Sequence, residues 1–194
     1  MDLSVKDAQS DMRQGYYSGA TGILASALVW FGAAGVAALS SPQKAMWTLL
    51  IGGMFIHPLG LLLCKLLGAR GAHAKGNPLG LLAGASTFWL IFCLPIAYLL
   101  GTNQPGLFFP AMLLIIGGRY LVFATLYGMR LYWALGLMLA AAGFALAALR
   151  ASVLAGATVG AVVEIVFAVV CFVQHQRWVR HETASKPSPL SGAA

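Results

Sequence analysis

The sequence predicts an all-α integral membrane protein in which six transmembrane helices form a single bundle. Of its 194 residues, 60% are hydrophobic and only 9% are charged, and the mean hydropathy is +0.83. A soluble domain carries about 25% charged residues, so a water-soluble fold is excluded. The apolar residues also gather into six runs, and each run is close to the roughly 20 residues that a helix needs to cross the hydrocarbon core of a membrane.

Turn-forming segments separate the six runs and set their limits. A β-barrel would show strands of about ten residues in which apolar and polar side chains alternate, whereas these runs are continuously apolar for about twice that length. The short connections make successive helices antiparallel. The expected spans cover residues 17–39, 44–67, 79–100, 106–128, 131–150 and 153–175.

Two polar segments flank the spans. Residues 1–16 carry three aspartates, which argues against a cleavable signal peptide. Within this segment, Ser4 followed by Asp7 is compatible with the capped start of a short helix on the membrane surface. Residues 176–194 contain a Pro-Ser-Pro run and end in small residues without an apolar period, so we expect a largely disordered tail.

The positive charges predict the orientation of the bundle. An even number of spans places both termini on the same side, where nine Lys or Arg residues lie, whereas only Lys44 and Arg150 lie on the other side. By the positive-inside rule both termini face the cytoplasm, as in a multi-pass protein of the inner or plasma membrane. This bias accounts for the net charge of +7, so we expect the lipid bilayer as a partner and no nucleic acid.

Three ionisable side chains lie near the centres of predicted spans, namely His57, Arg119 and Glu164. Placing such a group near the bilayer centre costs about 2.5–3.5 kcal/mol, so these residues face protein or water and are candidates for function. Their spans all run in the same direction, and a rise of about 1.5 Å per residue puts them in one thin layer. We therefore expect one polar cluster inside the bundle.

In the sixth span, small residues indicate which face packs against another helix. Gly156, Gly160 and Glu164 recur every four residues, so a stripe of small residues leads directly to the carboxylate. Glu164 is therefore expected to point at a neighbouring helix. The stripe fits packing within the chain and packing across a homo-oligomer equally well.

The second span has a similar face. Gly53, His57 and Gly60 follow spacings of four and three, which places His57 among small residues. Pro58 removes a backbone hydrogen bond and is expected to kink the helix beside His57. Bent helices at this depth are typical of solute-binding sites, although prolines are also common in membrane helices.

The predicted cluster has two interpretations. In the structural one, Arg119 and Glu164 form an ion pair and His57 donates to a carbonyl, which fixes three helices relative to one another. In the functional one, Glu164 binds a proton or a ligand and Arg119 holds an anion or tunes the carboxyl. Trp30 and Trp89 also lie near the centres of their spans, where they would form an aromatic wall for a ligand or serve packing alone.

Motifs for chemistry are weak. Cys171 and His175 are four residues apart, a spacing that suits metal ligands, but two ligands do not make a site. The sequence contains no G-x-S-x-G elbow, no H-E-x-x-H pair and no Gly-rich phosphate loop. It therefore gives no catalytic residue, no metal and no cofactor to expect.

Tyrosines gather at the predicted cytoplasmic ends of the fourth and fifth spans. Tyr120, Tyr127 and Tyr132, together with Arg130, are expected to be interfacial anchors. The segment Gly117-Gly118-Arg119-Tyr120-Leu121-Val122-Phe123-Ala124-Thr125-Leu126-Tyr127-Gly128-Met129 resembles an uncharacterised family of small bacterial multi-spanning membrane proteins of unknown function. The resemblance implies a bacterial inner-membrane protein and supplies no activity or site residue.

The function that the sequence favours is binding or transport of a small solute, proton-coupled through Glu164. Its alternative is a non-transporting scaffold or assembly subunit in which the polar groups only hold helices together. A membrane-embedded enzyme that acts on lipid comes third, because no catalytic constellation supports it.

Overall fold

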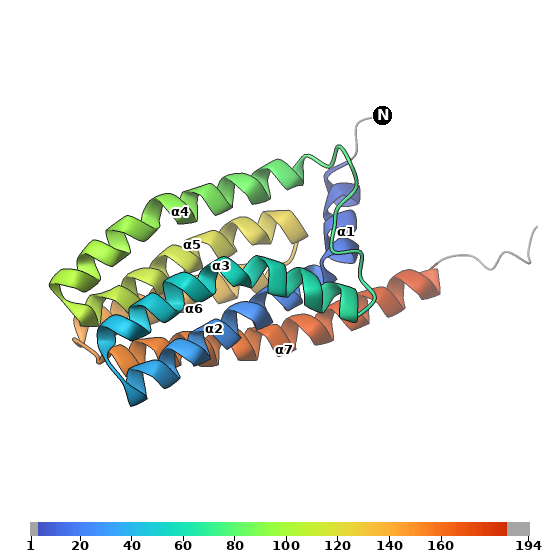
Figure 1. The fold of residues 1–194 in the computed structure, drawn as a ribbon. Helices are drawn as coiled ribbons and strands as arrows, with labels where there is room; N and C mark the ends of the chain where they lie inside the picture. Colours follow the sequence, from blue (N-terminus) through green and yellow to red (C-terminus); the bar gives the residue numbers. More distant parts are fainter. Residues whose placement is uncertain (1–3, 186–194) are drawn as a thin grey trace, which may run out of the picture.

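A computed structural model describes residues 4–185, and these residues form helices without any strand (Figure 1). The elements are α1 (Val5–Gly15), η1 (Tyr17–Gly19), α2 (Ala20–Leu39), α3 (Pro42–Leu66), α4 (Leu79–Asn103), η2 (Pro105–Leu107), α5 (Phe108–Tyr127), α6 (Leu131–Ala148) and α7 (Val153–Ser185). The two η elements are single turns of 3-10 helix. Within residues 4–185, six helices are long and apolar enough to cross a membrane, which confirms the predicted fold class.

Most helices begin and end within a few residues of the expected limits. α3 begins at Pro42 because proline suits the first position of a helix and the Ser41 side chain caps it. The sequence predicts that the last span ends at His175, but α7 continues to Ser185. Residues 176–185 contain neither Gly nor Pro, so the helical hydrogen bonds propagate beyond the apolar stretch. The rest of the expected disordered tail, residues 186–194, lies outside the described residues.

The interior of the bundle is built from α2, α5 and α7. α2 packs along both α3 and α7, α5 packs along both α4 and α6, and α5 and α6 also contact α7. α3 and α4 are consecutive in the chain but touch at few positions, since each packs on a different interior helix (Figure 1). Their outer faces carry large exposed apolar side chains, among them Met54, Phe88 and Phe92, as expected of helices that lipid surrounds.

α1 lies across one end of the bundle, which we call the α1 end (Figure 1). The connections α2–α3, α4–α5 and α6–α7 lie at the other end, the far end. Ser4 caps α1 by accepting a hydrogen bond from the Asp7 N–H, as the sequence indicates. Arg13 donates to the carbonyls of Tyr127 and Gly128, at 2.5 and 2.7 Å. Carbonyls at a helix end have no partner within the helix, so α1 completes the end of α5.

Asp11 joins α1 to the connection between α3 and α4. Its carboxylate accepts hydrogen bonds from Arg70 at 2.5 Å, from the Ala74 N–H at 2.8 Å and from Asn77 at 2.9 Å. Burial acts to raise the pKa of Asp11, but these three donors outweigh it and lower the pKa below its usual value. α1 therefore fixes two connections of the bundle, one through Arg13 and one through Asp11.

Candidate functional site

A carboxyl group lies inside the bundle, on α7. Glu164 is 0% exposed, and the Tyr120 hydroxyl of α5 donates to its Oε1 at 3.0 Å. Ser26 of α2 also interacts with this carboxyl. The second oxygen, Oε2, is buried without a hydrogen-bond partner. Glu164 thus meets polar groups from two other helices and has one oxygen that can accept a further donor.

Glycines of α7 allow α2 and α5 to come close to Glu164. A Cβ atom at Gly160 would collide with the indole of Trp30, and one at Gly156 would lie 2.7 Å from Cβ of Phe109. Trp30 is completely buried, with its ring centroid 5.8 Å from that of Phe109, and its Nε1 has no hydrogen-bond partner. The small-residue stripe of α7 therefore packs within the chain.

Arg119 points towards α4. It donates to Thr87 Oγ1 at 3.0 Å, and its guanidinium lies 5.1 Å from the centre of the Phe123 ring, while its Nε is buried without a partner. Among residues 4–185, no ion pair within 4.0 Å joins Arg119 to Glu164. The ion pair of the structural interpretation, one of the two that the sequence leaves open, is therefore wrong. Successive residues of a helix point about 100° apart, and on α5 the neighbouring Tyr120 is the residue that reaches Glu164.

His57 and Trp89 are not part of this cluster. His57 and Gly53 are exposed on α3, and a Cβ atom at Gly53 would meet nothing within 4 Å. Trp89 is 62% exposed on α4. On this face of α3, Gly60 does pack closely, since its Cβ would lie 3.4 Å from the Cα of Gly22 in α2. The expectations for His57, Trp89 and Gly53 are wrong because α3 and α4 are peripheral and turn much of their surface outwards.

The three tyrosines expected at the interface are buried instead. Tyr132 stacks against Tyr120 and Tyr127, with ring centroids 6.0 and 5.3 Å apart, and Phe123 packs edge-on against all three rings. The prediction of interfacial anchors is wrong because α1 covers this end of the bundle. Its buried residue Met12 belongs to the same hydrophobic core as the tyrosines.

A second buried polar cluster, which the sequence analysis does not identify, lies at the α1 end. Ser18 Oγ is 2.8 Å from His175 Nδ1, and the Ser18 carbonyl accepts hydrogen bonds from the Tyr132 hydroxyl at 2.7 Å and the Cys171 thiol at 3.4 Å. All four side chains are buried. We call this group the Ser18–His175 cluster. The signal that indicates it is the spacing of Cys171 and His175, which continues the stripe of Glu164 along α7.

The backbone that carries Ser18 has an unusual conformation. Tyr17, Ser18 and Gly19 have φ values of 52°, 56° and 84°, so three successive residues are left-handed. This conformation is costly for residues other than glycine. At Gly19 it also brings the backbone against Tyr132, whose hydroxyl a Cβ atom would strike. Tyr132 therefore contacts the turn at Gly19 and also donates a hydrogen bond to the Ser18 carbonyl.

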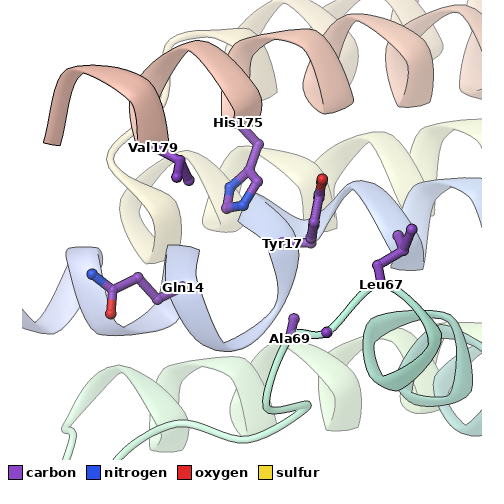
Figure 2. Close-up of a pocket in the computed structure, with 7 residues that line it drawn as sticks. Gln14, Tyr17, Leu67, Ala69, His175 and Val179 are labelled. Atoms are coloured by element: carbon purple, nitrogen blue, oxygen red, sulfur yellow. The ribbon is translucent and has the colours of Figure 1, made fainter. Parts of the chain in front are cut away.

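Two adjoining hollows lie beside this cluster. One, of about 160 Å³, is lined by Gln14, Tyr17, Leu67, Gly68, Ala69, His175 and Val179 (Figure 2). The other, of about 300 Å³, is lined by Tyr17, His175, Gln176, Val179 and Arg180. Together we call them the α1-end cleft. Figure 2 shows the imidazole of His175 next to Tyr17, and the two ring centroids are 4.0 Å apart. His175 therefore borders the polar cluster and also the cleft.

The buried clusters lack the composition of a metal site. Among residues 4–185, no three His, Cys, Asp or Glu side chains come together in a way that would hold a metal ion. Cys171 and His175, whose spacing suits metal ligands, both bond to Ser18.

Comparison with protein families matches residues 5–174 to a family described as a family of unknown function (DUF7010). The match runs from α1 into α7 and confirms the resemblance to an uncharacterised family. No curated protein and no solved structure matches the chain.

Proposed function

The chain belongs to this family of unknown function, and we propose that it binds or transports a small solute, with a proton taken up and released at Glu164. One observation supports the proposal. Three buried side-chain atoms of the described residues have no hydrogen-bond partner, and they are Trp30 Nε1, Arg119 Nε and Glu164 Oε2. Buried polar groups are nearly always paired, so unpaired ones call for an explanation such as a bound ligand, water or ion.

The surroundings of Glu164 suit coupling to a proton. The two groups identified at this carboxyl, the hydroxyls of Tyr120 and Ser26, are neutral, and no cation lies within ion-pair distance among residues 4–185. An isolated carboxylate is far more costly in apolar surroundings than a protonated carboxyl. Gain or loss of the proton therefore depends on what reaches Oε2, and a solute that changes this environment is coupled to the proton.

The proposal includes an orientation. Of the 12 Lys and Arg residues, nine lie in segments on the side of the two termini, which favours an α1 end that faces the cytoplasm. The resemblance to small bacterial proteins favours a bacterial inner membrane. A reporter enzyme that folds only outside the cytoplasm would be inactive when fused after residue 194. If that fusion were active, the C-terminus would lie outside the cytoplasm, and the proposed orientation would be wrong.

A second function, a non-transporting scaffold or assembly subunit, is favoured by the bonds between helices. Tyr120 and Glu164 join α5 to α7, and Arg119 and Thr87 join α5 to α4. In this function the polar groups keep the helices in register. Their replacement would reduce the amount of folded protein and would affect no flux.

Proton movement into vesicles separates the two functions. Wild-type protein, Glu164→Gln and the control Glu182→Gln, which changes the exposed glutamate of the same helix, are reconstituted around a pH-sensitive dye. The vesicles then receive amino acids, sugars, organic cations and organic anions in turn. We expect one solute class to move protons with wild type and with Glu182→Gln, and no movement with well-folded Glu164→Gln. A wild type without solute-induced flux, combined with poor folding of Glu164→Gln, would support the scaffold.

A further inference from the structure

The Ser18–His175 cluster shares one face of α7 with the buried carboxyl. Glu164, Ala168, Cys171 and His175 follow one another at spacings of four, three and four residues, and all are buried. At a rise of about 1.5 Å per residue, this face extends about 16 Å from Glu164 to His175. It therefore connects the interior of the bundle with the α1-end cleft.

We propose that Glu164 exchanges its proton with water at the α1 end alone. The path consists of hydroxyl groups and one imidazole, those of Tyr120, Tyr132, Ser18 and His175. This inference rests on the proposed function, because it requires an exchangeable proton on Glu164. It goes further by assigning the side from which the proton comes and a role to the second cluster.

At the outer end of the path, a direct contact joins the cleft to Ser18. His175 lines both hollows of the cleft, and its Nδ1 is 2.8 Å from Ser18 Oγ. A proton accepted on one ring nitrogen is balanced by a proton that the other nitrogen gives up, so the imidazole passes a proton on without a lasting change of charge. The hydroxyl of Ser18 likewise accepts one proton and gives up another. Tyr132 donates to the backbone carbonyl of Ser18 at 2.7 Å, so its hydroxyl lies at the inner side of this turn. A carbonyl does not pass a proton on, so in the proposed path a water molecule links the hydroxyls of Ser18 and Tyr132.

The inner half of the path runs between two stacked tyrosines. The rings of Tyr132 and Tyr120 are inclined by 27°, and both hydroxyls reach the α7 face, one 4.0 Å from Cys171 Sγ and the other 3.0 Å from Glu164 Oε1. These α7 residues are two turns apart, about 10 Å along the helix. In the proposed path, water molecules bridge the two hydroxyls. The unpaired Oε2 of Glu164 is an acceptor that one of these waters would use.

Towards the far end, the same face of α7 is sealed by apolar groups. Trp30 covers Gly160 and Phe109 covers Gly156, and the neighbouring Ala157 and Ala161 are 0% exposed. An indole N–H is a donor only, so Trp30 cannot accept and pass on a proton. This face of α7 is polar between Glu164 and the α1 end and apolar between Glu164 and the far end. A proton therefore reaches the carboxyl from the α1 end only.

Few titratable groups compete with His175 at the mouth of the path. Tyr17 of η1 lies against its ring, Arg13 of α1 acts on it electrostatically, and Arg180 lines the cleft beside it. The two arginines are permanently charged donors without an acceptor site. His175 is thus the group among these whose ring accepts a proton on one nitrogen while the other nitrogen gives one up.

Infrared spectroscopy of the reconstituted protein tests the path. When H₂O is exchanged for D₂O, the C=O stretch of a protonated carboxyl shifts, and the band that Glu164→Gln abolishes belongs to Glu164. The rate of this shift is compared among wild type, His175→Gln, Ser18→Ala and a control, His181→Gln, which replaces an exposed histidine on the same helix. We expect the first two variants to slow the shift by about 100-fold, the size of effect of a positioned acid–base group, and the control to match wild type.

Each outcome has a distinct meaning. Slow exchange in a folded His175→Gln or a folded Ser18→Ala, with normal exchange in the control, supports the path, and either variant suffices if the other does not fold. Wild-type rates in both variants refute the path but leave Glu164 as the proton site. A wild type that shows no Glu164 carboxyl band at any pH overturns the proposed function and the path together.

Discussion

Replacing Gly160 with alanine tests whether the Trp30 indole packs directly against α7 at this glycine. The new Cβ would lie closest to Cε3 of the indole and 2.7 Å from Cδ2 and Cζ3, so the ring would have to retreat by more than about 0.7 Å to reach the 3.4 Å at which ordinary contact begins. Trp30 is fully buried against Phe109 and has little room to do so. Overpacking of this kind costs about 1–3 kcal/mol, and we expect Gly160→Ala to lower the free energy of unfolding by about 2 kcal/mol.

Gly53→Ala is the matched control. It also lies within a membrane-spanning helix, but its Cβ would meet nothing within 4 Å, and alanine favours a helix by up to about 1 kcal/mol over glycine. Unfolding of both variants is followed in mixed micelles as the fraction of denaturing detergent rises. We expect a loss of stability for Gly160→Ala alone, and a smaller loss when Trp30→Leu is already present. Equal stability of the two alanine variants would refute the close contact of α2 with α7.

Three further predictions concern the α1 end and the buried carboxyl. Because the pKa of Asp11 is lowered in the folded protein, its bonds to the α3–α4 connection stabilise the fold at neutral pH and are lost below about pH 4, so proteolysis of that connection should rise in acid. Asp11→Asn should be cleaved readily at every pH, and equal resistance to wild type would contradict this. Arg13→Gln should lower the free energy of unfolding by about 2 kcal/mol and speed amide hydrogen exchange in α1. Unchanged exchange would mean that the two hydrogen bonds of Arg13 do not stabilise the position of α1. A double-mutant cycle of Tyr120→Phe and Glu164→Gln should give a coupling energy of about 0.6–1.7 kcal/mol, and strict additivity would argue against their bond.

Hydropathy and spacing predict most of this fold, because a membrane span is a local property of the chain. Length and apolar composition locate all six spans, and the spacing of Gly156 and Gly160 indicates the face of α7 that packs. The end of α7 is predicted less well. Hydropathy marks where the apolar stretch ends, whereas the helix itself ends where its backbone hydrogen bonds stop.

Spacing shows which residues share a face but not what that face meets. His57 lies among small residues as Glu164 does, yet α3 is peripheral and α7 is interior, and this difference arises only when all helices are packed. The partners of Glu164 and Arg119 are missed for a related reason. Tyr120 and Thr87 are ordinary membrane residues, and their roles depend on rotations of α5 and α4 about their own axes.

The pairing of α2 with α7 has a consequence for biosynthesis. α2 leaves the ribosome well before α7, so Ser26 and Trp30 remain in the bilayer without their α7 partner until the intervening helices and α7 have been made. α4 likewise lacks its main packing partner until α5, the next span, has been made. Insertion of the helices therefore precedes assembly of the interior, and a nascent chain halted before Val153 would leave the α7-facing side of α2 uncovered and open to membrane proteases.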